Sequence, residues 1–296
     1  MRSSRVDLHI HSTASDGVLT PSEVVRLALE RGLEVIALTD HDTMSGLSEA
    51  QAAAADTSLE VIPGVEINSE GEWGELHILG FYVHPDHPFL NEQLQAVREG
   101  RARRARMIVD RLNGLGLRLD WEEVQALASG PSIGRPHIAQ ALLNRGYIAS
   151  LGEAFERYIG REGPAYVPRL RMTPPEVIHA IREAGGVAVL AHPAHSNVTG
   201  RIEEFVGYGL QGLEVYYPTH SPHDVAALLN LCRRFGLLAT GGSDFHGPAH
   251  AEGVLPGTVN VPLRCVEELR RAGQQRGRSK TSSTSSVSNG LALRRR

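Results

Sequence analysis

The sequence has two cysteines, one lysine and no long apolar run, and these scarcities exclude several classes of protein. Cys232 and Cys265 lie far apart among the 296 residues, so the chain has neither a disulfide framework nor a CxxC metal site. No apolar run approaches the ~18 residues that a membrane helix needs. We therefore expect a cytoplasmic protein that makes no membrane contact.

The excess of negative over positive charge is also small, since the formal net charge is only -4 at pH 7. This excludes a protein whose main role is to coat nucleic acid, so any contact with nucleic acid should be local. The composition, 41% hydrophobic and 22% charged, is typical of a globular chain. Its length is sufficient for one large domain with an insertion.

Short apolar segments alternate with helical patterns along most of the chain. Seven segments are predicted as strands: residues 5–11, 34–39, 60–65, 76–83, 187–190, 213–216 and 237–240. Helix starts with proline at the first helical position follow Thr20, Thr173 and Ser221. The alternation predicts an α/β protein with a mostly parallel sheet, either closed as a barrel or doubly wound. The site should then lie at the C-terminal ends of the strands.

Two regions break this alternation. Residues 86–163 have helical periodicity and no convincing strand, which predicts a helical insertion that caps the site. Residues 273–296 are rich in serine, threonine and basic residues and poor in apolar ones, which predicts a disordered tail. The main domain should therefore comprise residues 1–85 and 164–272.

Residues of the types that bind metals recur beside the predicted strand ends. His9 and His11 are two positions apart, so in a strand they point the same way. Two histidines that merely satisfy each other at a strand end would need no partners on other strands, yet such partners recur along the chain. The candidates beside the strand ends are His9, His11, Asp16, Asp40, His41, Asp42, Glu66, His77, His192, His195, Asp244 and His246.

Nitrogen and oxygen ligands without a thiolate suit Mn, Fe or Zn, and we favour Mn. Clustered cations, typically ~3.5–4 Å apart, can hold a phosphate ester and activate water without a protein nucleophile. The sequence has neither a GxSxG motif nor a P-loop lysine pattern. These features together predict a metal-dependent hydrolase.

Six motifs, in order, resemble the signature motifs of the PHP (polymerase and histidinol phosphatase) family of metal-dependent phosphoesterases. They are DLHIHSTASDG, ALTDHDT, GVEIN, HILG, AHPAH and GGSDFHG, starting at residues 7, 37, 64, 77, 191 and 241. The resemblance covers residues 1 to about 265 and implies a distorted (β/α)7 barrel, with the insertion on its C-terminal face. The run SIGRPHIA, residues 132–139, further resembles the branch that contains RNase AM, a 5′-end exoribonuclease and nucleotide phosphatase.

The resemblance implies two or three divalent metal ions. One would be held by His9, His11, Glu66 and Asp244, and Glu66 would bridge to a second held by His77 and His192. A third would use Asp16, His41 and His246.

Several residues outside this set are candidates for binding substrate or moving protons. A guanidinium such as that of Arg135 can grip a phosphate bidentately, and the Gly-Arg-Pro-His context with His137 favours this over a solvated arginine. His195 either acts on the leaving group or phosphate, as a catalytic or binding residue, or is an ordinary loop histidine. Asp40 and Asp42 either orient ligand imidazoles or shape the loop. The arginines of residues 101–106 are interpreted as a solvated helix face.

The implied function is hydrolysis of phosphate esters of nucleotides or short 5′-phosphorylated RNA by a metal-activated hydroxide, without an obligate protein partner. Alternatives are a histidinol-phosphate-type phosphatase and a non-catalytic PHP module, although such modules tend to lose ligands and here all nine positions are filled. An amidohydrolase-type barrel is disfavoured because that class usually has a lysine at a strand end, whereas Lys280 lies in the predicted tail.

Overall fold

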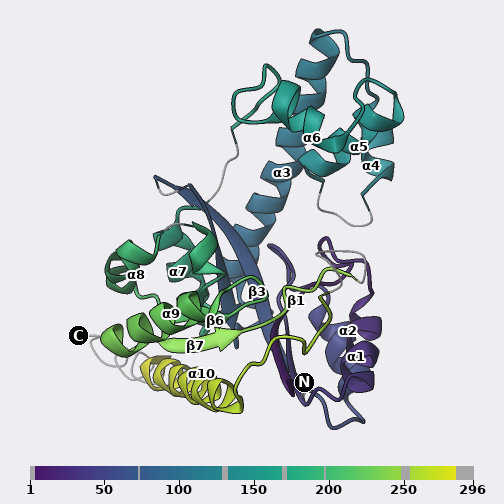
Figure 1. The fold of residues 1–296 in the computed structure, drawn as a ribbon. Coiled ribbons are helices and arrows are strands. Elements are labelled where there is room, and N and C mark those ends of the chain that lie inside the picture. The colour runs from purple at the N-terminus through teal and green to yellow at the C-terminus, as the bar shows by residue number, and fades with distance from the viewer. Residues whose placement is uncertain are drawn as a thin grey trace, which may run out of the picture.

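The structure is a computed structural model that describes residues 4–72, 74–128, 133–168, 172–196, 198–247 and 254–284, with backbone alone at residues 101 and 276–284. Its centre is a seven-stranded sheet in which the strands follow one another in chain order (Figure 1). The strands are β1 (Val6–Ile10), β2 (Val35–Leu38), β3 (Glu60–Gly71), β4 (Gly74–Phe81), β5 (Val187–Leu190), β6 (Gly212–Tyr216) and β7 (Leu238–Gly241). All seven predicted strands are thus confirmed.

The segment after β7 joins the sheet back to β1. Ile10 forms a parallel bridge with Phe245, the backbone N–H of His11 donates to Phe245 O at 2.9 Å, and that of Asp244 donates to His9 O at 2.9 Å. These contacts close the curved sheet into the distorted (β/α)7 barrel that the motifs implied.

The sheet is mostly parallel, as predicted, and the exception is β4, which pairs antiparallel with both β3 and β5. The reason is the connection, because only residues 72 and 73 separate β3 from β4. Two residues can close a hairpin but cannot make the crossover that a parallel pair requires. The remaining neighbouring pairs are parallel.

Helices surround the barrel, and those that begin after Thr20, Thr173 and Ser221 start where the cap signals predicted. The surrounding helices are α1 (Pro21–Glu30), α2 (Leu47–Ala54), α7 (Pro174–Glu183), α8 (Ile202–Tyr208), α9 (Pro222–Phe235) and α10 (Leu263–Thr284). In α1, the Thr20 hydroxyl accepts from Glu23 N and the Glu23 carboxylate accepts from Thr20 N, which satisfies two otherwise free donors. No helix in the described ranges is long and apolar enough to span a bilayer.

Helix α10 continues beyond the point where we predicted the tail to begin. It runs through residues 273–284, because Gly273 packs closely on Tyr82 and the glutamine and arginine residues that follow favour helix. A disordered tail from residue 273 is therefore wrong for this stretch, and residues 285–296 lie outside the described residues.

The described part of residues 86–163 contains only helices, turns and loops. These helices are α3 (Pro88–Gly114), α4 (Trp121–Ala126), α5 (Arg135–Asn144) and α6 (Leu151–Ala154), followed by a π-helical turn at Phe155–Ile159. Leu90 and Leu94 at the start of α3 belong to the barrel core, whereas Ile108 and Leu112 near its end belong to a second core within the insertion. The long α3 therefore carries the insertion away from the barrel (Figure 1).

A buried carboxylate stabilises the point where the barrel closes. Asp7 on β1 is fully buried and accepts hydrogen bonds from the backbone N–H groups of Ser243 at 2.9 Å, Gly257 at 2.8 Å and His9 at 3.3 Å. It thus ties β1 to two segments that lie about 240 residues further along the chain.

We expect Asp7→Ala to lower the free energy of unfolding by about 3 kcal/mol or more, because each buried donor left without an acceptor costs about 1–3 kcal/mol. Urea denaturation at pH 7 measures the change. Asp110→Ala, on the exposed face of α3, is the matched control and should leave the midpoint nearly unchanged. Equal midpoints for the two variants would contradict the structural role of Asp7.

Candidate metal centre

The structure brings the nine predicted ligands together at one edge of the barrel. The residues from parallel strands lie at or just after the ends of those strands: His9 on β1, His11 just after it, His41 after β2, His192 after β5, and Asp244 with His246 after β7. Asp16 lies in the loop that follows β1. The convergence follows from the shared direction of these strands, whose carboxyl ends meet at one edge.

Glu66 and His77 do not lie at strand ends, so the prediction that every ligand lies at one is wrong for them. Glu66 is inside β3, which continues well past the end of β2, and His77 is in the first half of β4. Because β4 is antiparallel to its neighbours, its first half reaches the edge at which the parallel strands finish. Asn68 and His77 are cross-strand partners in this hairpin.

The Glu66 carboxylate is the centre of the cluster, and the side chain is only 1% exposed. Five imidazoles surround its two oxygens. Oε1 lies 3.0 Å from His77 Nδ1 and 3.4 Å from His192 Nε2, and Oε2 lies 3.1 Å from His41 Nδ1, 3.2 Å from His11 Nε2 and 3.3 Å from His9 Nε2.

Three groups in the cluster have ligand atoms within 4.8 Å of one another. They are His9, His11, Glu66 and Asp244; His41, Glu66 and His77; and His11, Asp16, His41 and His246. The first equals the set that the family motifs imply. The others differ from the implied sets, because His11 also joins the Asp16 group and His41 joins Glu66 and His77.

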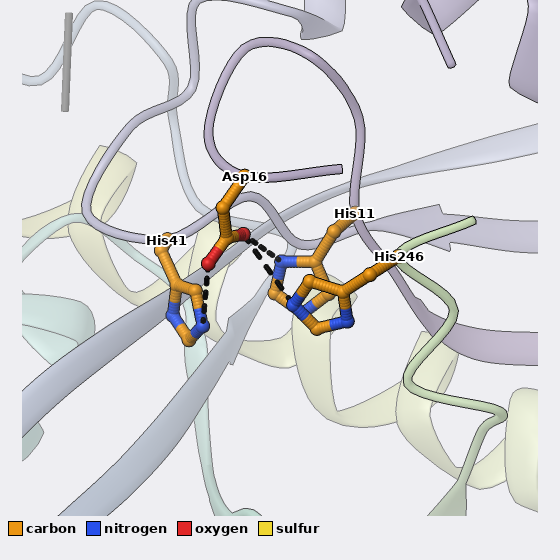
Figure 2. Close-up of side chains that lie close together, drawn as sticks. All are labelled: His11, Asp16, His41 and His246. Atoms are coloured by element: carbon orange, nitrogen blue, oxygen red, sulfur yellow. Dashed lines mark ion pairs between the residues drawn. The ribbon is translucent and has the colours of Figure 1, made fainter. Parts of the chain in front are cut away.

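Asp16 faces three imidazoles from three different parts of the barrel (Figure 2). Its carboxylate oxygens lie 3.4 Å from His246 Nε2, 3.8 Å from His11 Nδ1 and 3.9 Å from His41 Nε2. The rings of His11 and His246 stack with centroids 4.0 Å apart. This group is the most open part of the cluster, since the Asp16 side chain is 51% exposed.

The donor atoms fit divalent cations better than they fit one another. His9 Nε2 and His11 Nε2 face each other at 3.1 Å, a separation at which two imidazoles attract only if a proton or a cation lies between the two nitrogens. His11 Nδ1, Glu66 Oε2 and Asp244 Oδ1 are buried without a hydrogen-bond partner among the described residues. Buried polar atoms of this kind are expected to have partners, and cations would supply them.

The carboxylates also hold protons on the histidines. Burial lowers the pKa of His11, but Asp244 and Glu66 outweigh it and raise that pKa to about 10. Burial likewise opposes the charged form of His77, yet Glu66 raises its pKa to about 9. Burial dominates at His41 and lowers its pKa to about 3. The protons on His11 and His77 therefore provide, beside the carboxylates, the positive charge that a bound cation would otherwise provide.

Comparisons with known proteins agree with this geometry. A family model described as the PHP domain matches residues 7–128. A 5′-3′ exoribonuclease of Haemophilus influenzae is 38% identical over 82% of this chain and 90% of its own. A 3′,5′-nucleoside bisphosphate phosphatase of Chromobacterium violaceum is 35% identical over 88% of this chain and 94% of its own. The chain belongs to the PHP family.

Solved structures show the same fold. A protein from Bifidobacterium adolescentis, described as a metal-dependent phosphoesterase, has a TM-score of 0.78 at 32% identity and covers 90% of this chain and 96% of its own. A protein from C. violaceum, described as an amidohydrolase, has a TM-score of 0.77 at 34% identity and covers 91% of this chain and 97% of its own.

Around the PHP cluster, the two aspartates that flank His41 shape the loops. Asp40 accepts from Ser12 N and Ser12 Oγ, each at 2.7 Å, and from Ser15 Oγ at 2.6 Å, which agrees with the loop-shaping alternative. Asp42 accepts from the side-chain amide of Asn68 at 3.1 Å, and that amide lies 3.2 Å from His41 Nδ1. Asp42 thus reaches a ligand imidazole only through Asn68 in this chain of contacts.

Sequence reasoning missed two residues of β6 and the loop after it. Glu214 lies 2.9 Å from His9 Nδ1, and the Tyr217 hydroxyl donates to Asp244 Oδ2 at 2.8 Å. A glutamate and a tyrosine in the run LEVYYP carry no signal in one sequence, because their partners lie far away along the chain.

Of the predicted substrate residues, His195 lies beside His192 of the cluster, whereas Arg135 and His137 lie in the insertion, and none of them belongs to the three groups. His195 is on a 3₁₀ turn with Nε2 2.5 Å from Thr219 Oγ1, and burial and the neighbouring His192 lower its pKa. Arg135 and His137 begin α5. Burial lowers the pKa of His137, and the nearby Asp16 carboxylate opposes that shift, so the insertion does approach the Asp16 group. Ser132 of the same motif lies outside the described residues.

The arginines of α3 show mainly structural contacts. Arg104 donates to Val167 O at 2.7 Å, and Arg111 donates to Tyr166 O. Arg98 donates to Asp42 O at 2.7 Å. These bonds hold the segment at Tyr166 and Val167 and the loop after β2. The interpretation of residues 101–106 as a solvated helix face is therefore wrong for Arg104, whose guanidinium is part-buried and bonded to backbone.

The raised histidine pKa values predict how metal binding depends on pH. A cation must displace the protons on His11 and His77, which both carry them at pH 6 and pH 8, so Mn²⁺ should bind more tightly as the pH rises. The affinity should increase about tenfold per pH unit for each proton displaced. Calorimetry of Mn²⁺ binding to metal-free protein in buffers of different ionisation enthalpy measures both quantities. The same dissociation constant at both pH values, with no proton release, would contradict this electrostatic picture.

Proposed function

We propose that this chain is a metal-dependent phosphoesterase that removes phosphate from 3′,5′-bisphosphonucleotides and hydrolyses the 5′ ends of short RNA. The observation that carries the proposal is the buried Glu66 carboxylate, with eight further nitrogen and oxygen ligands around it at an edge of the barrel. The relatives named as an exoribonuclease and as a bisphosphate phosphatase support the substrate class. We place the activity in the cytoplasm, where the free thiols of Cys232 and Cys265 stay reduced.

The proposed metal ligands are the nine side chains of the cluster, which would hold two or three cations, with Mn²⁺ favoured. When bound, such cations polarise the phosphoryl group, lower the pKa of water and stabilise charge on the leaving oxygen. The side chains of the protein would orient the substrate and exclude competing ligands. No cysteine takes part, because burial raises the pKa of Cys232 to about 12 and that of Cys265 to about 11, far from thiolate.

Arg135 and His137 are the proposed phosphate-binding residues of the insertion. The Arg135 guanidinium lies over the Phe155 ring, 5.5 Å from its centroid, which restricts the plane of its donors. His137 Nδ1 accepts from Gly134 N at 3.0 Å, so the neutral ring carries its proton on Nε2. Both residues can then donate to an anion without titrating.

His195 is proposed to bind phosphate or the leaving group at the rim. Because burial and His192 lower its pKa, the neutral ring predominates at pH 7, which favours a hydrogen-bond donor over a general acid. No described contact favours a histidinol-phosphate-type substrate. A non-catalytic module is disfavoured because every ligand position of the family motifs is filled.

A substrate panel tests the proposal. Metal-free protein loaded with Mn²⁺ is assayed for phosphate release from a 3′,5′-bisphosphonucleotide and from histidinol phosphate, and for mononucleotide release from 5′-phosphorylated oligonucleotides. We expect the highest kcat/KM for the bisphosphonucleotide and measurable shortening of the oligonucleotides. Preference for histidinol phosphate, or no hydrolysis of any substrate, would refute it.

Asp244→Asn should leave the fold intact and abolish hydrolysis. The amide has nearly the same shape as the carboxylate but lacks the anionic charge that a cation requires. Phosphate release at saturating Mn²⁺ measures the loss, and circular dichroism checks the fold. Asp110→Asn on the exposed face of α3 controls for an unrelated loss of charge. Near wild-type turnover by Asp244→Asn would contradict the assignment of Asp244 as a metal ligand.

Arg135→Ala should lower kcat/KM for the bisphosphonucleotide roughly tenfold to a hundredfold, because it removes a charge-assisted contact worth ~1.5–3 kcal/mol. Hydrolysis of p-nitrophenyl phosphate, which has no second phosphate, should change little. Arg103→Ala, an exposed arginine of α3, is the matched control. Equal losses on both substrates would mean that Arg135 holds the reacting phosphate. No loss on either substrate would mean that Arg135 is a solvated arginine that does not bind phosphate.

A further inference from the structure

Strand β6 carries a charged residue in the interior of the barrel that none of the family motifs includes. Glu214 is 0% exposed, and its neighbours on the strand, Leu213 and Val215, are buried apolar residues of the main core. A carboxylate at such a depth is costly unless each oxygen has a donor. Glu214 satisfies this condition with two donors that both belong to predicted metal ligands.

The first donor is the imidazole of His9. Glu214 Oε1 lies 2.9 Å from His9 Nδ1, which places a proton on Nδ1. The other ring nitrogen, Nε2, is then the one with a free lone pair in the neutral ring. It lies 3.2 Å from Asp244 Oδ1 and 3.3 Å from Glu66 Oε2, in the middle of the cluster. Glu214 therefore selects both the tautomer and the orientation of His9 that a metal requires.

The second donor is the backbone of His192. Its N–H donates to Glu214 Oε2 at 2.8 Å. His192 has φ +30, a conformation that residues other than glycine rarely adopt, so surrounding contacts must hold it there. In that conformation His192 Nε2 lies 3.4 Å from Glu66 Oε1. One side chain thus fixes ligands that come from two different strands, β1 and β5.

We propose that Glu214 is a positioning residue of the metal centre, which sets metal affinity by fixing the His9 imidazole and the strained backbone at His192. It does not itself touch a ligand position for substrate or cation. The inference rests on the metal centre of the proposed function, but it concerns binding of the cation and not the identity of the ester that is hydrolysed.

Glu214→Gln tests the two contacts together. A carboxylate offers an oxygen to each donor, whereas an amide offers one oxygen and turns its NH₂ group towards the other donor. We expect Mn²⁺ to bind about tenfold to a hundredfold more weakly to Glu214→Gln than to wild type. Calorimetric titration of the metal-free protein with Mn²⁺ measures the dissociation constant in the absence of substrate.

Glu60→Gln is the matched control. Glu60 is a glutamate on barrel strand β3, but it pairs with Arg270 of α10, and it lies six residues before Glu66 in the strand. It should bind Mn²⁺ as wild type does. The melting temperature of each metal-free variant shows whether it folds, and if Glu214→Gln does not, Glu214→Asp is titrated in its place. The shorter side chain cannot reach both donors, so its Mn²⁺ affinity should also fall.

Wild-type Mn²⁺ affinity in the folded Glu214 variant would overturn the proposal, as would an equal loss of affinity in Glu60→Gln. Because no substrate is present, the result does not depend on the substrate panel. If wild type binds Mn²⁺ but hydrolyses none of the tested esters, the proposed function fails and the role of Glu214 stands.

Discussion

The buried carboxylate of Glu66 is the constraint around which this protein is built. Five imidazoles lie within 3.4 Å of its oxygens, and a carboxylate so deep in a protein is stable only with positive charge beside it. In the absence of cations, that charge comes from protons, which is why the pKa values of His11 and His77 rise. A divalent cation, with two positive charges, would meet the same electrostatic demand that the protons on His11 and His77 meet here.

Closure of the barrel and assembly of the site use the same stretch of backbone. The segment that bonds to β1 after β7 is also the segment that carries Asp244 and His246. Four described residues other than glycine have positive φ, and three of them, Asp42, His192 and Asp244, lie at or next to the cluster. Such conformations persist only where surrounding contacts hold them, so the strain is concentrated where side chains must be aimed. A fully relaxed barrel edge would not direct these side chains inwards.

The sequence alone predicted all seven strands and a group of metal-binding residue types at one edge of the sheet, because the period of a strand and the direction of parallel strands determine where such side chains go. The resemblance to the family motifs then selected the nine residues of the cluster from these candidates. No sequence pattern indicated that β4 runs antiparallel, because the two strands were predicted at 60–65 and 76–83, whereas in the structure they extend to Gly71 and from Gly74 and leave a connection of two residues. Sequence reasoning also missed Glu214, since the His9 ring that Glu214 orients is 205 residues away along the chain. A contact between residues so far apart leaves no recognisable pattern in the sequence, whereas His9 and His11 form a visible His-x-His pattern. The composition after residue 273 suggested disorder, and this prediction failed for residues 273–284. The packing of Gly273 on Tyr82 cannot be foreseen from either residue, because the two are far apart along the chain.

The residues proposed for metal binding and those proposed for phosphate binding come from different parts of the chain. The predicted metal ligands all come from the barrel, where backbone hydrogen bonds between neighbouring strands hold them, while Arg135 and His137 come from a helix with a core of its own. Helix α3 joins the two, because its first turns pack in the barrel core and its last turns in the insertion core. The hydrogen bonds from Arg98 to the loop after β2 and from Arg104 to Val167 restrict how far this helix can tilt. The proposed metal ligands and the proposed phosphate-binding residues therefore depend on two different cores, so a change in the packing of the insertion need not disturb the surroundings of Glu66.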